Sequence, residues 1–94
     1  MKHLNIKVYG AVQGVFFRTT AKDQADKLNL TGFVKNEPDG TVYIEAEGEK
    51  DSLDKFVSWC KNGPNLAKVE KLKITKGPLK NFSTFKRDFL DFKN

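Results

Sequence analysis

The chain is poor in the residues that build cross-linked or metal-held domains. It has one cysteine, Cys60, and one histidine, His3, among its 94 residues. A single cysteine excludes an internal disulfide, and the absence of any cluster of histidine, cysteine and carboxylate residues argues against a metal centre. We therefore expect a cytoplasmic protein without a metal or other cofactor. Cys60 is expected to be a core thiol and His3 a surface residue at the start of the first strand.

Long apolar runs are also missing. No stretch approaches the roughly 20 apolar residues of a transmembrane helix, and the first residues, MKHLNI, lack the apolar segment and cleavage site of a signal peptide. The net charge is +5, and this excess lies wholly in residues 51–94. Because these lysines form no arginine run and no ladder with aromatic residues, we read them as a solvated face. We expect no membrane partner, no nucleic-acid partner and a monomer.

The hydrophobic periodicity predicts one domain over residues 1–94, with two helices among five strands. One helix is predicted from about Phe17 or Arg18 to Leu28, with Asn29 at its end. The other is predicted at about 51–61, capped by Asp51 or Ser52. The predicted strands are 2–9, 32–36, 41–47, 69–75 and a short fifth at 85–89. The order βαββαβ, with right-handed crossovers, places both helices on one face of an antiparallel sheet. This is a ferredoxin-like α+β sandwich with an extra C-terminal strand.

Aromatic residues gather near the end of the chain. We expect them to bury the C-terminal strand against the body of the domain rather than to stack on bases, and we expect Trp59 to pack at the edge of the second helix. The C-terminal aromatics are Phe82, Phe85, Phe89 and Phe92.

The strongest local signal is the sequence GAVQGVFFR, residues 10–18, between the first predicted strand and the first predicted helix. Glycines let a turn present its N–H groups, the start of a helix adds unpaired N–H groups, and Arg18 adds a forked cation suited to phosphate. The pattern indicates an anion site, although two glycines and a surface arginine also fit a plain turn.

Asn36 ends the second predicted strand, 18 residues after Arg18. The first and second strands run parallel in this topology, so their C-terminal ends lie at the same edge of the sheet and the two side chains can converge. An arginine with an amide can bind an anion and orient a water molecule. Asn36 also fits a simpler role, because it precedes the turn at Pro38-Asp39-Gly40 and asparagine is common in hairpin turns.

GAVQGVFFR (10–18) together with GFVKNEPDG (32–40) resembles the paired signature of the acylphosphatase family, and Gly63, Pro64, Ala67 and Val69 fit its later pattern. The resemblance covers nearly the whole chain. It implies the ferredoxin-like fold and an enzyme, an acylphosphatase, that hydrolyses acyl phosphates to a carboxylate and inorganic phosphate without a metal. It further implies a small-molecule acyl phosphate as substrate, with inorganic phosphate as product and inhibitor.

The resemblance also assigns roles. Arg18 binds the phosphoryl group and Asn36 holds the attacking water, which makes these two the catalytic residues. The phosphoryl group is also bound by backbone N–H groups of the loop, which comprises Val12, Gln13, Gly14, Val15, Phe16, Phe17 and Arg18. The motif of residues 10–18 contains no histidine, aspartate or glutamate, and neither Arg18 nor Asn36 is a base, so a phosphoryl oxygen is the expected acceptor of the proton from water.

Two other functions share features with this sequence. RNA-recognition modules have the same βαββαβ order and use aromatics on the sheet for stacking. Here the third strand places Tyr43 beside Glu45 and Glu47, which would repel phosphates. A related domain serving a larger carbamoyl-transfer machine would need a partner for the missing domains. Hydrolysis of benzoyl phosphate by this chain alone, with a chelator present, discriminates among the three.

Overall fold

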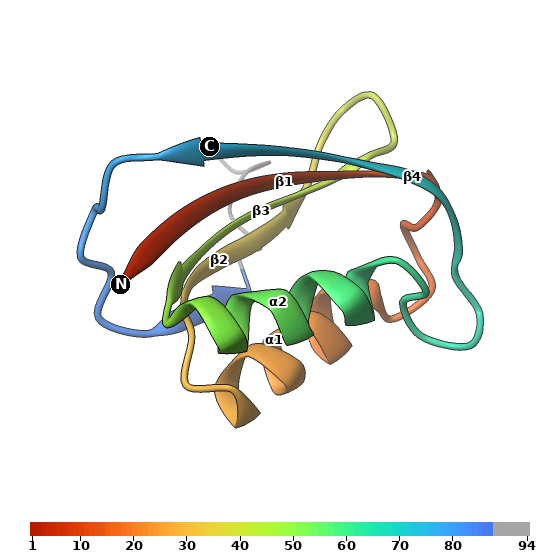
Figure 1. Cartoon of the computed structure of the whole chain (residues 1–94). Helices are drawn as coiled ribbons and strands as arrows, with labels where there is room; N and C mark the ends of the chain where they lie inside the picture. Colours follow the sequence, from red (N-terminus) through yellow and green to blue (C-terminus); the bar gives the residue numbers. More distant parts are fainter. Residues whose placement is uncertain (88–94) are drawn as a thin grey trace.

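The computed structural model describes residues 1–87. A five-stranded sheet forms one layer of the structure, and the two helices form the other (Figure 1). Its strands lie in the order β4-β1-β3-β2-β5, with β3 at the centre. Neighbouring strands are antiparallel except for β2 and β5, which are parallel, so the sheet is mixed rather than wholly antiparallel. The strands are β1 (Lys2–Ala11), β2 (Thr31–Asn36), β3 (Val42–Gly48), β4 (Lys68–Gly77) and β5 (Phe85–Arg87).

The two helices, α1 (Phe17–Lys27) and α2 (Lys50–Cys60), cover the same face of the sheet (Figure 1). Strand residues at alternate positions face them, and Ile6, Val8 and Ile44 are fully buried there. Cys60 is buried in this core, where burial raises the pKa of its thiol, and Trp59 packs partly buried against it. The predicted fold class and both of these placements are confirmed.

Element ends differ from the prediction in small ways. Helix α2 begins at Lys50 with Glu49 at the N-cap, so Asp51 lies in its first turn instead of capping it. Asp51 there faces the positive end of the helix dipole, which is the other favourable place for an acidic residue. Asn29 follows α1 with a φ of 59°, as a C-terminal residue of this type often does.

The C-terminal aromatics behave as expected where the structure describes them. Phe85 is 3% exposed and packs edge-on against Phe56 at 6.0 Å between ring centroids. Phe82 packs against Phe33 at 5.8 Å on the opposite face of the sheet. Phe89 and Phe92, and with them the last part of the predicted fifth strand, lie outside the described residues.

The expectation of a surface His3 is wrong, because His3 is 3% exposed. Its Nδ1 lies 2.7 Å from Glu47 Oε2 and its Nε2 lies 2.8 Å from Asn5 Oδ1. The connection between β4 and β5 covers this end of the sheet face that lacks helices: Phe82 stacks on His3. The N–H groups of Lys80 and Asn81 donate to Glu47. The sequence around His3 could not reveal this burial, because the segment that covers it lies far along the chain.

Because of Glu47, the free energy of unfolding of this protein should fall at acid pH. Burial by itself raises the pKa of the Glu47 carboxyl, but hydrogen bonds from the Lys80 N–H, from His3 and from neighbouring N–H groups outweigh it, so the pKa lies below its ordinary value of 4.5. A carboxylate with a lowered pKa in the folded state stabilises the fold at pH values above its unfolded pKa, and this contribution is lost as the pH falls through the folded pKa.

Glu47→Gln is therefore expected to lower the free energy of unfolding at pH 7 by about 1–3 kcal/mol, because an amide NH₂ group would meet buried donors. Urea denaturation measured from pH 7 down to pH 3 checks this. The difference in the free energy of unfolding between wild type and variant should become smaller below about pH 4.5, the ordinary pKa of the carboxyl group. A gap independent of pH would show that the charge of Glu47 contributes nothing to stability.

Candidate active site

The loop that follows β1 is held at both ends by buried side chains. Val12 and Phe17 are each 1% exposed, and the Phe17 ring packs against Trp59 at 5.2 Å between centroids. Burial of these two residues fixes where the chain leaves the sheet and where α1 begins. The residues between them, Gln13 to Phe16, turn the backbone at the edge of the domain.

Gln13 ties this loop to the turn between β2 and β3. Its Nε2 donates to the carbonyl oxygen of Glu37 at 2.8 Å and to that of Thr41 at 2.9 Å. Asp39 closes the same turn by accepting from the hydroxyl and the N–H of Thr41, and these bonds with the ion pair to Lys7 lower the pKa of Asp39 to about 2. These hydrogen bonds therefore fix the loop and the turn relative to each other.

The loop backbone adopts positive φ angles at two positions. Gly14 has a φ of 75°. Phe16 has the left-handed helical angles φ 66° and ψ 18°, and it is 70% exposed. A left-handed conformation costs a phenylalanine about 1–2 kcal/mol, and strain of this kind concentrates at functional sites. Within the described chain, the N–H groups of residues 13–17 donate to no backbone carbonyl among the turn and loop bonds. They are available to an anion at the positive end of α1.

Gly14→Ala is expected to reduce turnover far more than it reduces stability. A Cβ at Gly14 would meet no atom within 4 Å, so only the positive φ opposes it, at about 1–2 kcal/mol. The matched control is Gly32→Ala, where the Cβ would lie 1.8 Å from the Glu45 carbonyl oxygen and the loss of stability should exceed about 4 kcal/mol. Thermal unfolding and hydrolysis rates measured together check this. Full activity in Gly14→Ala would mean that this glycine is incidental.

Arg18 is the second residue of α1 and is half-buried. It lines a cavity of about 210 Å³ that begins at the loop. The residues around this cavity are Gly14, Phe16, Phe17, Arg18, Thr19 and Arg87. Four residues of the predicted phosphate loop thus surround one cavity at the helix start, with a second arginine that the sequence did not indicate. No local pattern could have found Arg87, because its place here depends on which strand β5 joins.

Asn36 lies at the same end of the sheet as the loop. It pairs with Val42, which pairs in turn with Val8, so Asn36 is level with the last part of β1. Alternation with buried Val34 places its side chain on the face that the helices cover. Its Oδ1 atom is buried and accepts no hydrogen bond from the described chain. Asn36 is not among the residues that line the 210 Å³ cavity.

A buried amide oxygen without a donor costs about 1–3 kcal/mol, and native proteins rarely keep one without a reason. The oxygen of Asn36 is an acceptor placed at the edge of the sheet from which the loop also rises. Such a group can hold a water molecule, which needs an acceptor to fix its direction.

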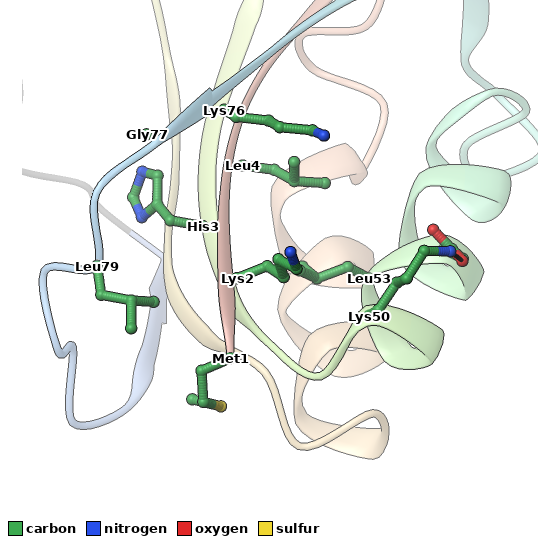
Figure 2. Close-up of a pocket in the computed structure, with 10 residues that line it drawn as sticks. Met1, Lys2, His3, Leu4, Lys50, Leu53, Lys76, Gly77 and Leu79 are labelled. Atoms are coloured by element: carbon green, nitrogen blue, oxygen red, sulfur yellow. Dashed lines mark hydrogen bonds and ion pairs between the residues drawn. The ribbon is translucent and has the colours of Figure 1, made fainter.

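The other end of β1 carries a cavity of about 380 Å³ (Figure 2). Leu4, Leu53 and Lys76 lie on one side of the strand there, and His3 points to the other (Figure 2). None of the predicted site residues lines this cavity. Across residues 1–87, no helix is long and apolar enough to cross a membrane, and no three His, Cys, Asp or Glu residues are grouped to hold a metal ion.

Comparison of the sequence with known proteins identifies the acylphosphatase family. The model of the acylphosphatase family matches residues 4–89. The chain is 48% identical over 82 residues to an acylphosphatase of Archaeoglobus fulgidus, covering 87% of this chain and 92% of the relative. The crystal structure of acylphosphatase from Bacillus subtilis is 40% identical with a TM-score of 0.92, covering 95% of this chain and all of that one. Full-length HypF is similar at 30% identity and a TM-score of 0.83, over 93% of this chain but only 12% of HypF.

Proposed function

Because this chain belongs to the acylphosphatase family, we propose that the loop of residues 12–18 and Asn36 together form its catalytic site. The protein is an acylphosphatase: it hydrolyses acyl phosphates to a carboxylate and inorganic phosphate. The observation that supports the proposal most is the loop backbone: the N–H groups of residues 13–17 donate to no backbone carbonyl among the turn and loop bonds of the described chain, and the loop leads directly into the start of α1 at Arg18.

The phosphoryl group binds in the loop. Its oxygens accept hydrogen bonds from the N–H groups of residues 12–18, and the Arg18 guanidinium adds a forked, permanently charged donor. These donors are held in place by the burial of Val12 and Phe17 and by the bonds from Gln13 to the neighbouring turn. Because they do not reorganise during the reaction, they stabilise the charge that spreads over the phosphoryl oxygens in the transition state.

Asn36 positions the water. Its buried Oδ1 accepts a hydrogen bond from the water molecule that attacks phosphorus. A bond forms between the water oxygen and phosphorus while the bond from phosphorus to the acyl oxygen breaks, and the electron pair of that bond leaves with the carboxylate. A phosphoryl oxygen takes the proton of the water. A carboxylate is a good leaving group, so no general acid is needed. The main contribution of the protein is to hold the water in position for attack on phosphorus.

Hydrolysis of benzoyl phosphate by the purified chain, with a chelator present, tests the proposal. We expect turnover without added metal and without a partner protein. Dependence on an added divalent ion would contradict a site made only of loop N–H groups, Arg18 and Asn36. Turnover by the chain alone would also separate an independent enzyme from a domain that works only within a larger protein such as HypF, of which the matching part is 12%.

Inorganic phosphate is expected to inhibit competitively and to raise the melting temperature. It is a product that fits the same donors, and a ligand that binds only the folded state stabilises it. At about 100 times its Kd, phosphate should add roughly 2.7 kcal/mol to the free energy of unfolding. Thermal unfolding in phosphate and in chloride at matched ionic strength checks this. Equal melting temperatures in the two salts would mean that the loop is not an anion cradle.

We further propose a single-domain, cytoplasmic monomer. The single cysteine, buried as a thiol with no disulfide partner, is compatible with a reducing compartment. Sedimentation of the purified chain at the concentrations used for the assay tests the oligomeric state.

A further inference from the structure

Arg87 reaches the candidate site from a part of the chain far from both motifs. It ends β5, which runs parallel to β2 with Arg87 opposite Val34. Asn36 is two residues further along β2, so Arg87 is its diagonal neighbour in the sheet. Phe85, two residues before Arg87, is buried among the core residues. Alternation along the strand therefore turns Arg87 toward the helices as well.

The Arg87 guanidinium contacts α1 beside the catalytic arginine. Its Nη1 donates to the hydroxyl of Thr19, the residue that follows Arg18. Successive residues of a helix point about 100° apart, at 3.6 residues per turn. Arg18 and Thr19 therefore project from α1 in different directions, and Arg87 contacts the start of the helix at the position next to Arg18.

Thr19 and Arg87 form the boundary between two adjoining cavities. The first is the 210 Å³ cavity at the loop, which reaches from Gly14 to Arg87. The second, of about 520 Å³, lies between α1 and β5 on the other side of the same two residues. Its lining residues are Thr19, Lys22, Asp23, Phe85, Lys86 and Arg87. Lys22 forms an ion pair with Asp26 at 2.7 Å, so Lys86 and Arg87 against Asp23 leave this space with a net positive charge.

We propose that Arg87 forms an acyl-group subsite that selects acyl phosphates whose acyl group carries a second anionic group. This inference rests on the proposed catalytic site, because it takes the phosphoryl group to lie in the loop. The acyl group must then leave the loop along the cavity wall. Arg87 stands on that wall, and a carboxylate is the group that its planar fork binds in a bidentate manner. Arg87 is a specificity residue in this proposal and takes no part in the attack on phosphorus.

A pair of rigid substrates tests this. 4-Carboxybenzoyl phosphate and 4-carbamoylbenzoyl phosphate have nearly the same shape and differ by one negative charge. In Arg87→Gln, the ratio of kcat/KM for the carboxylate substrate to that for the amide should fall about tenfold, the lower end of what a hydrogen bond between charged groups provides. This fall in the ratio should come from a higher KM for the carboxylate substrate. Arg87→Lys, which keeps the charge without the fork, should retain part of the preference.

Lys76→Gln is the matched control. It removes the same charge at the far end of the sheet, where Lys76 pairs with Leu4, and it should leave the ratio unchanged. A ratio within twofold of wild type in both Arg87 variants would overturn the subsite, and so would an equal fall in Lys76→Gln, which would show a general effect of net charge. The melting temperature of each variant verifies that the comparison is made on folded protein.

Arg18→Ala separates this inference from the site on which it rests. It should lower kcat/KM for both substrates alike. If it leaves turnover of the amide substrate intact, the proposed catalytic site is wrong whatever Arg87 does. If it abolishes turnover while Arg87→Gln leaves the ratio unchanged, the catalytic site stands and only the acyl subsite is refuted.

Discussion

Arg18→Ala is expected to lower kcat/KM for benzoyl phosphate by about a hundredfold or more. A hydrogen bond to a charged group contributes about 1.5–3 kcal/mol, and a guanidinium can make two to one phosphoryl group. Arg18 is held at the start of α1, where the helix dipole and the loop N–H groups already favour an anion. Its removal therefore weakens phosphate binding as well as turnover.

Arg18→Lys should rescue little of this loss, because an ammonium group is a point charge and cannot reproduce the planar fork. Lys27→Ala provides the control, since it removes a positive charge from the exposed last turn of the same helix. Initial rates with benzoyl phosphate, together with phosphate affinity by calorimetry, measure both effects. Near-normal turnover in Arg18→Ala or Arg18→Lys would remove this residue from the site.

Asn36→Ala is expected to lower kcat by about 10²–10³, the usual cost of losing an oriented hydrogen-bonding group at a reacting centre. Phosphate affinity should stay nearly intact, because in the proposed site the phosphoryl group is held by Arg18 and the loop. Groups that bind ground and transition states alike affect KM, whereas groups that act only in the transition state affect kcat. This division makes the proposed roles of Arg18 and Asn36 distinguishable by experiment.

The same variant should unfold at nearly the melting temperature of wild type, because Asn36 Oδ1 accepts no hydrogen bond from the described chain and its removal leaves no donor of that chain unpaired. A variant that binds phosphate tenfold more weakly yet turns over normally at saturation would make Asn36 a binding or turn residue, and another group would have to hold the water.

Local patterns in the sequence were enough to predict the strands, the helices and the turn between the second and third strands. The alternation of Ile6 and Val8, and of Val42, Ile44 and Ala46, predicts strands with one buried face, and these residues are buried in the structure. The turn at Pro38-Asp39-Gly40 depends on residues next to one another in the chain. The loop before α1 also depends on neighbouring residues, and Gly14 in it has the positive φ that a glycine in a tight turn allows. The roles of Arg18 and Asn36 in that loop and strand remain predictions.

The tertiary structure decided what depends on segments distant in sequence. His3 is buried because residues 80–82 return across the sheet and donate to Glu47. Arg87 lies beside Thr19 because β5 joins the edge of β2, a pairing that no periodicity specifies. Periodicity determines which face of a strand is apolar, since that follows from the spacing of side chains along one segment. It does not determine what covers the opposite face or which edge a short strand joins, because those depend on the free energy of contacts between segments that meet only in the folded chain.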